Sequence, residues 1–304
     1  MVTYLVPSDT ARLAHAGVTN CQNMGLLLTR FTSKEAISGE NAESVNDKNV
    51  KERDVWFRQI TSQIRVNSDD LGRMIVATGD RWQSMTANAS RFSMYNRSRL
   101  LIGLGAKGAL EIGITLHHTT GLPYIPGSAL KGLARTYALL SLAAELQSGQ
   151  DELEQLDADL MLGRLDSTLE LAAAYREIFG FAANEHLSDS DAGKAVFFDA
   201  ILFDVLIEPP NSEIFSIDVM TPHFTDYYRA SGGDAPHDAG NPIPVSFLTV
   251  NEGFVFRFAV GTRGNGTEEH RKQARMWLRG GLTELGVGSK TAAGYGIFAS
   301  VPKK

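Results

Sequence analysis

The spacing of apolar residues along the chain predicts several helices. In these segments apolar residues recur every three or four positions with charged residues between them, which is the pattern of a helix that buries one face. The segments are 50–64, 69–85, parts of 153–180, and 268–285. Trp56 and Trp82 are two of the regularly spaced apolar residues, so we expect them to pack in the core rather than to stack on a nucleic-acid base.

Other segments are predicted to be strands, either because apolar and polar residues alternate in them or because they are rich in β-branched and aromatic residues. The predicted strands are 109–118, 196–207 as a central strand with 214–219 as its candidate partner, 254–260, and a short strand at 297–301. The polar segment 32–49 and the long irregular segment 221–242 are expected to be loops. Mixed helices and strands of this kind indicate an α+β protein.

The first candidate site lies where the predicted strand 109–118 passes through a turn with two prolines into a helix, which is expected to begin at Gly127 and Ser128. The first amides of a helix have no partner within it and lie at the positive end of its dipole, so they suit a phosphate. Lys131 and Arg135 follow on the same face of the helix, near that end. The alternative is an ordinary helix start with two solvated cations.

The second candidate site is the glycine-rich segment Gly286–Gly296, which contains Ser289, Lys290 and Thr291. A nucleotide-binding P-loop is disfavoured, because Ser289 and Glu284 stand where that motif needs glycine and only a short strand follows. Glycines would allow a backbone to approach an extended polyanion closely, and Lys290 would add one charge. The alternative is a turn that packs its glycines against a sheet.

Charge is distributed unevenly along the chain, although the net charge is only −6. Residues 51–107 hold ten Lys and Arg against five Asp and Glu, and residues 257–304 hold nine against three. Residues 151–218 hold three against sixteen. This segregation suits a polyanion on one side and a basic protein neighbour on the other.

Composition also bounds the kind of protein. No apolar run is long enough to span a membrane and the start resembles no signal peptide, so we expect a soluble cytoplasmic protein without a membrane partner. Cys21 is the single cysteine, which excludes an internal disulfide and a zinc site made of several thiolates. We expect Cys21 to be a small buried residue.

The two candidate sites together are more specific than either alone. A strand followed by Gly121-Leu-Pro-Tyr-Ile-Pro-Gly-Ser-Ala-Leu-Lys-Gly132, with Gly286-Val-Gly-Ser-Lys-Thr-Ala-Ala-Gly-Tyr-Gly296 near the C-terminus, resembles the RAMP superfamily of CRISPR RNA-binding proteins. Within it, residues 218–228 and 241–253 are similar to the sixth-subunit family of the type III-B, or Cmr, effector complex. The resemblance covers roughly residues 99–301.

This resemblance implies a ferredoxin-like, RNA-recognition-type β-α-β-β-α-β core of the Cas7-like kind, with helical insertions. It implies a basic, mainly helical N-terminal extension at 1–98 and a RAMP domain at 99–304, with insertions at about 138–195 and 220–245. The residues that match the RNA-holding motifs of the family are Gly127, Ser128, Lys131, Arg135, Gly286, Gly288, Ser289, Lys290, Thr291, Gly294 and Gly296.

The function that the resemblance implies is that of a non-catalytic RNA-binding subunit. Such a subunit holds the CRISPR guide RNA near its 3′ end for pairing with target RNA. It lies beside other Cmr subunits, above all the repeated backbone subunit, and we expect it to need no cofactor.

An endoribonuclease that acts on the guide precursor or the target is the alternative function. His117 and His118, at the end of the predicted strand, and His223 are the residues that could serve as general acid or base. A metal site is a further alternative, because His223, Asp226, His237 and Asp238 lie close together in sequence. Their spacing matches no metal motif, so we expect no metal. No tyrosine or lysine partner at a telling spacing accompanies the histidines, so we expect no catalytic residue.

Overall fold

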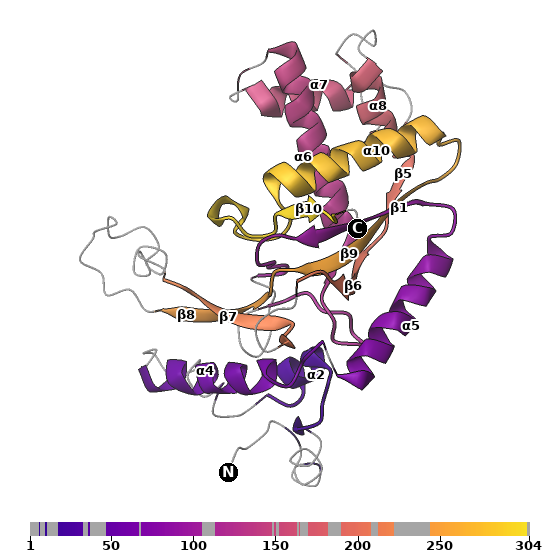
Figure 1. Ribbon diagram of the computed structural model, residues 1–304. Helices are drawn as coiled ribbons and strands as arrows, with labels where there is room; N and C mark the ends of the chain where they lie inside the picture. Colours follow the sequence, from indigo (N-terminus) through magenta and orange to yellow (C-terminus); the bar gives the residue numbers. More distant parts are fainter. Residues whose placement is uncertain are drawn as a thin grey trace, which may run out of the picture. The chain divides into compact units, whose positions relative to one another are not determined.

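The computed structural model describes two compact units, and each is treated by itself (Figure 1). The first unit comprises Met1–Gly72, Gly103–Leu122 and Pro209–Asn251; the second comprises Arg73–Ile102, Pro123–Glu208 and Glu252–Lys304. The described residues are 6, 10, 18–32, 36, 47–66, 68–104, 113–147, 149, 152–162, 164, 170–181, 190–207, 212–221 and 244–302.

The second unit is built on a six-stranded sheet in which every neighbouring pair is antiparallel. Along the sheet the strand order is β10-β1-β9-β6-β2, and β5 also pairs with β9. The strands are β1 (Ser90–Asn96), β2 (Tyr124–Ile125), β5 (Ala195–Phe197), β6 (Ala200–Val205), β9 (Phe254–Thr262) and β10 (Phe298–Ser300).

Apolar side chains cover both faces of the central strand β9. Phe254, Phe256 and Phe258 are fully buried, and so is Ala259, whose side chain points to the opposite face because successive residues of a strand alternate. On that opposite face Ala259 packs with Trp82 of α5 (Asp69–Met85). Burial on both faces explains why this segment of the sequence is nearly continuous in apolar residues.

Four further helices belong to the second unit: α6 (Gly127–Leu146), α7 (Leu153–Leu162), α8 (Glu170–Phe179) and α10 (Glu268–Gly280). Helices α6, α8 and α10 pack on one another. Trp277 of α10 stacks on Phe179 and meets the edge of Tyr175, with ring centroids 5.7 and 6.4 Å apart. A small hairpin, β3 (Gly180–Phe181) and β4 (Asp191–Ala192), follows α8. These contacts fix α8 against α10.

The first unit contains α2 (Met24–Thr29), α4 (Asp47–Thr61) and an antiparallel pair of strands, β7 (Phe215–Met220) and β8 (Val245–Val250). Helix α4 packs on both strands. Trp56, Phe57, Phe215 and Phe247 are at most 2% exposed and make up its core. The amphipathic pattern of α4 is therefore explained by the strand pair that covers its apolar face.

The predicted helices are confirmed, as are the core positions of Trp56 and Trp82, which are 2% and 5% exposed. The strand predicted at 109–118 is wrong over 113–118, where the structure has only an isolated bridge at Leu116; residues 109–112 lie outside the described residues. The strand that precedes the helix is instead the two-residue β2. Cys21 is half-buried and its thiol has no disulfide partner.

Two details of the strand predictions also need correction. The segment 196–207 is divided into β5 and β6 at Phe198 and Asp199. The candidate partner at 214–219 pairs with β8 rather than with β6, because β9 and β2 already occupy the two edges of β6. Strand β1 was not predicted, although Phe92, Met94 and Asn96 are buried and alternate with exposed or half-buried residues.

Neither compact unit begins or ends a segment at residue 98, where the sequence predicted a domain boundary. Strand β1 lies before that boundary and yet is a central strand of the sheet. Within the described residues, no helix is both long and apolar enough to cross a membrane.

Candidate nucleic-acid interface

Helix α6 begins at Gly127, directly after β2, as the sequence predicts. A side chain could not be accommodated at Gly127, since a Cβ atom there would lie 2.1 Å from the carbonyl oxygen of Phe197. The start of the helix is thus pressed against the end of β5, and glycine is required because two backbones approach each other.

The first amide of α6 is occupied by a carboxylate of the protein itself. The amide of Gly127 donates to Oδ1 of Asp199 at 2.7 Å. Within the described part of the chain, the amides of Ser128 and Ala129 have no acceptor, and Ser128 is exposed. Asp199 therefore sits where the sequence suggested a phosphate, and it uses the same attraction for negative charge.

Lys131 and Arg135 are both held by partners inside the protein. Nζ of Lys131 donates to the carbonyl oxygen of Phe179 at 3.0 Å. The Arg135 guanidinium donates to both oxygens of Asp157, at 2.7 and 2.9 Å, and to Oη of Tyr175 at 2.9 Å. Lys131 therefore ties α6 to α8, and Arg135 ties α6 to both α7 and α8. Binding of RNA by these residues stays a prediction.

The surroundings shift the pKa values of these groups. Burial lowers the pKa of Lys131, and the nearby charges of Arg263 and Arg135 lower it further. Burial also acts to lower the pKa of Arg135, but hydrogen bonds and charge from Tyr175 and Asp157 outweigh it and raise the value. No carboxylate is among the groups that shift the pKa of Lys131, whereas Asp157 is among those that shift the pKa of Arg135.

The glycine-rich loop, residues 286–296, follows a single turn of π-helix, η3 (Gly281–Leu285). It is anchored on the segment that follows β1: the amide of Ser289 donates to the carbonyl of Leu101 at 2.7 Å, and the amide of Gly296 to that of Arg99 at 2.8 Å. Gly286, Gly288, Gly294 and Gly296 all have positive φ, a conformation that glycine adopts without strain.

The loop is also closed upon itself. The amide of Val287 donates to the carbonyl oxygen of Gly296 at 2.9 Å. A Cβ atom at Gly288 or Gly296 would lie 2.2 or 2.0 Å from a backbone oxygen. Lys290 has a left-handed backbone and begins a short 3-10 turn, η4 (Thr291–Ala293). Glycines of the loop therefore pack against neighbouring backbone, and Lys290 is half-buried.

Comparison with known proteins identifies the family. Residues 95–299 match the model of the RAMP superfamily. The chain is 32% identical over 241 residues to the CRISPR system Cmr subunit Cmr6 of Pyrococcus furiosus, over 71% of this chain and 69% of that protein. The chain belongs to the Cmr6 family of the RAMP superfamily. The CMR subunit Cmr6 of Saccharolobus solfataricus is 24% identical over 262 residues, 83% of this chain and 73% of its own length.

One solved structure has a similar fold. A chain in a cryo-EM structure of the type III-B Cmr-beta bound to cognate target RNA is similar with a TM-score of 0.53 and 22% identity, over 88% of this chain and 79% of that chain. The crystal structure of Cmr6 from Pyrococcus furiosus gives a TM-score of 0.41 at 32% identity, over 70% of this chain and 98% of that chain.

Of the three histidines considered for catalysis, the structure describes His117 and His118. In this RAMP protein His117 and His118 are exposed, and Nδ1 of His117 lies 3.0 Å from the hydroxyl of Thr119. His223, Asp226, His237 and Asp238 lie outside the described residues. Among the residues that the structure describes, no group of three His, Cys, Asp or Glu side chains could hold a metal ion.

Sequence reasoning missed the partners that organise this site. Asp199, Asp157 and Tyr175 are distant from α6 in sequence, and only the fold brings them to Gly127 and Arg135. It also missed the exposed arginines Arg97 and Arg99, which border the loop's anchor. The sequence would have placed these arginines between β1 and the anchor at Leu101 only if β1 had been predicted.

Proposed function

We propose that the protein is a non-catalytic RNA-binding subunit of a type III-B, or Cmr, effector complex. The observation that carries the proposal is the 32% identity to a Cmr6 subunit over 71% of the chain. In this role the protein holds the guide RNA near its 3′ end and contacts neighbouring subunits, above all the repeated backbone subunit, while the guide pairs with target RNA.

The second unit serves this function as a ferredoxin-like core. Its chain order of β1, α6, β6, β9, α10 and β10 is strand, helix, strand, strand, helix, strand. In the sheet these four strands stand in the order β10-β1-β9-β6, which is fourth, first, third, second in the order of the chain. Both features are those of the β-α-β-β-α-β core, and they support the proposal.

The RNA is held by backbone amides and a few cations, so the protein has little preference for base sequence. The loop contributes Gly286, Gly288, Ser289, Lys290, Thr291, Gly294 and Gly296, and α6 contributes Gly127, Ser128, Lys131 and Arg135. The positive φ values of the loop glycines support the assignment of the loop residues. The amides of Ser128 and Ala129 support the assignment of the α6 residues.

Two lysine variants test the site. Lys131→Ala and Lys290→Ala should each weaken association with single-stranded RNA. The slope of log K against log salt is negative, and its magnitude should decrease by about 0.7 for each phosphate that the side chain no longer neutralises. Arg81→Ala is the control, because Arg81 is an exposed cation on α5, on the other face of the sheet. Unchanged RNA binding in both lysine variants would refute this placement of the RNA.

The alternative function, an endoribonuclease, makes a different prediction. The exposed His117 and His118 are then required for cleavage of labelled repeat RNA or target RNA. The proposed function expects no cleavage by the purified wild-type protein. Cleavage that His117→Ala or His118→Ala abolishes would overturn it.

A further inference from the structure

Three arginines form a stripe along one flank of α10. Arg271, Arg275 and Arg279 follow one another at intervals of four residues, so their Cα atoms are about 6 Å apart along the helix axis. They lie beside the apolar stripe of Ala274, Trp277 and Leu278 that faces the core. We call these three residues the arginine stripe.

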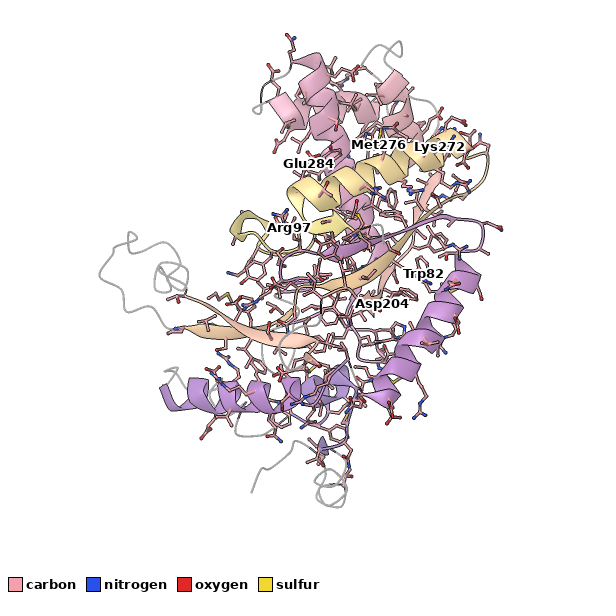
Figure 2. All side chains as sticks on the ribbon, viewed as in Figure 1. Trp82, Arg97, Asp204, Lys272, Met276 and Glu284 are labelled. Carbon is pink, nitrogen blue, oxygen red and sulfur yellow. The ribbon has the colours of Figure 1, made fainter. Side chains whose placement is uncertain are left out.

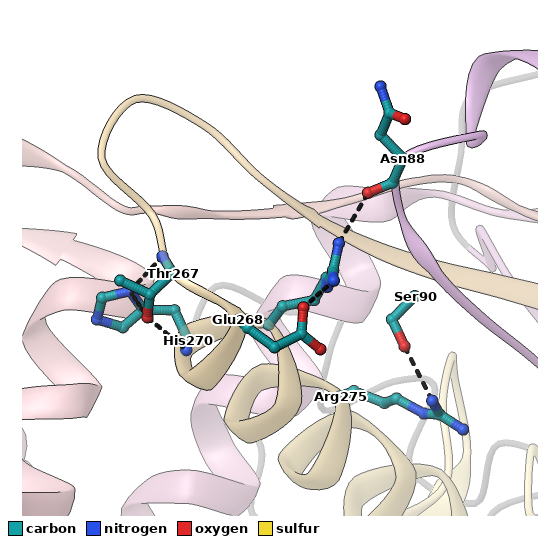
Figure 3. Close-up of polar contacts among 7 residues, drawn as sticks. Asn88, Ser90, Thr267, Glu268, His270 and Arg275 are labelled. Atoms are coloured by element: carbon teal, nitrogen blue, oxygen red, sulfur yellow. Dashed lines mark hydrogen bonds and ion pairs between the residues drawn. The ribbon is translucent and has the colours of Figure 1, made fainter.

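Each arginine of the stripe is positioned by a neutral acceptor on or next to the strands below it. Arg271 donates to the backbone oxygen of Asn88 at 2.9 Å, and Arg275 to the hydroxyl of Ser90 at 2.9 Å (Figure 3). Arg279 donates to the hydroxyl of Ser300 in β10 at 2.9 Å. Such bonds fix the direction of a guanidinium group and leave its charge in place.

The aromatic ring of Phe92 supports two members of the stripe. The guanidinium carbons of Arg275 and Arg279 lie 5.2 and 5.4 Å from the centre of this ring. Phe92 is 8% exposed and stacks on Phe258, with centroids 5.2 Å apart. A planar guanidinium that rests on an aromatic face is held in one orientation.

The charges of the stripe are only partly neutralised within the protein. Arg271 has an ion pair with Glu268 (Figure 3). For Arg275 and Arg279 the described residues include no carboxylate within ion-pair distance. Burial lowers the pKa of Arg275, and the charge of Arg279 lowers it further. Two adjacent arginines that repel each other on a rigid support favour an anionic ligand from outside.

We propose that the arginine stripe is a second binding track for single-stranded RNA, which engages consecutive phosphates of its backbone. The inference rests on the proposed function and adds a site to it. A stripe with one cation per turn of helix matches a ligand with regularly spaced charges, such as the phosphates along a nucleic-acid strand.

The position of the stripe supports the same ligand. Helix α10 continues through η3 into the glycine-rich loop, and Ser300 under Arg279 belongs to the strand that follows this loop. The amide of Arg97 donates to the carbonyl oxygen of Ile297, directly before that strand, at 2.8 Å. Figure 2 labels Arg97 and, in η3, Glu284. A strand that runs along the stripe therefore leads toward the loop with Lys290 and the exposed Arg97 and Arg99.

The test uses the full chain and a fluorescently labelled oligouridylate. The double variant Arg275→Gln/Arg279→Gln should decrease the magnitude of the negative slope of log K against log salt by about 0.7 for each phosphate that is no longer neutralised. The double variant with lysine at both positions keeps the charges without the planar group, so its slope should stay near that of the wild type. Arg81→Gln, on α5 at the other face of the sheet, should leave the slope unchanged.

The outcomes separate this inference from the proposed function. If the double glutamine variant keeps the wild-type slope, RNA binding by the arginine stripe is refuted and the proposed function stays intact. Equal weakening by lysine and glutamine would show that the arginines act only through the fold. Normal RNA binding with loss of a neighbouring subunit would overturn the RNA ligand in favour of a protein. A wild-type protein without salt-dependent RNA binding would refute both proposals.

Discussion

At the scale of single residues, Gly127 shows how a motif that resembles a ligand site can also be a packing requirement. The helix begins at Gly127 because the backbone of β5 is so close that a Cβ atom would lie 2.1 Å from the Phe197 oxygen. The Asp199 carboxylate then accepts from the first amide. Glycine at this position is explained by the fold before any RNA is considered.

We therefore expect Gly127→Ala to destabilise the protein. A backbone oxygen cannot move away as a flexible side chain can, so the cost should be about 1–3 kcal/mol in the free energy of unfolding, measured with urea. Gly132→Ala is the matched control. Gly132 lies in the same helix with no atom within 4 Å of the added Cβ, and alanine there should stabilise by about 0.5–1 kcal/mol. Equal effects of the two changes would contradict the packing argument.

At the scale of elements, polar groups connect the helices that cover the sheet. Glu177 of α8 binds His270 of α10, which also accepts in the capping box at the start of that helix. Nζ of Lys194 lies 3.2 Å from the same carboxylate. These contacts join α8, α10 and the segment before β5 at one carboxylate.

This cluster predicts that acid destabilises the second unit. Burial acts to raise the pKa of Glu177, but the hydrogen bonds and charges of His270 and Lys194 outweigh it and lower the value below the ordinary 4.5. A carboxylate with a lowered pKa stabilises the folded state fully above the unfolded-state value and loses this contribution as the pH falls through the folded-state value. Thermal unfolding between pH 7 and pH 3 should therefore show a smaller acid-induced decrease in the melting temperature for Glu177→Gln than for the wild type, and an identical decrease would contradict this role.

The Arg135 cluster joins α6 to α7 and α8. Asp157 accepts from Arg135 and from the fully buried Tyr175, whose hydroxyl lies 2.6 Å from Oδ1 of Asp157. Burial and this hydrogen bond raise the pKa of Tyr175, so its hydroxyl stays protonated and donates. Because Asp157 joins two partners, the three side chains should act as one unit.

We expect Arg135→Met to reduce the free energy of unfolding by about 1–2 kcal/mol, because Asp157 then loses a charged donor in a partly buried site. Asp157→Asn should cost a similar amount, and the double variant should cost less than the sum. Urea unfolding of the wild type and the three variants measures this coupling. Additive effects would show that the ion pair contributes nothing.

At the scale of the whole molecule, acidic and basic residues are concentrated in different segments of the chain. Residues 151–218 contain sixteen acidic and three basic residues. Part of this acidity is used internally, since Asp157 and Glu177 form ion pairs with Arg135 and Lys194. Glu152, directly before α7, and Glu154, in its first turn, are exposed, and Oε2 of Glu152 accepts from the amide of Gly149 at 3.1 Å.

Charge reversal at α7 should therefore disturb assembly before it changes RNA binding. Glu152→Lys/Glu154→Lys is expected to reduce co-purification with neighbouring subunits, because like charges then face each other. The affinity for free single-stranded RNA should stay within a few-fold of the wild type, with the unaltered protein assayed in parallel. Weaker RNA binding with normal assembly would contradict this assignment of the acidic segment.

The sequence by itself determined the helices and the two glycine-containing motifs. Periods of three to four residues and glycine-proline turns are local features, and 50–64, 69–85 and 268–285 became helices as predicted. The resemblance to the RAMP superfamily was likewise carried by short motifs, and the match over residues 95–299 confirms it. Local patterns sufficed because the spacing of apolar residues already records which face of a helix will be buried.

Only the tertiary structure decided which elements meet and what the cations contact. Strand β1 lies between β10 and β9, and 214–219 pairs with β8; both pairings join residues far apart in sequence. Lys131 and Arg135 received partners from α8 and α7, while Arg275 and Arg279 came to rest on Phe92 of β1. A sequence records which residues carry charge, but burial and packing determine which charges an internal carboxylate neutralises.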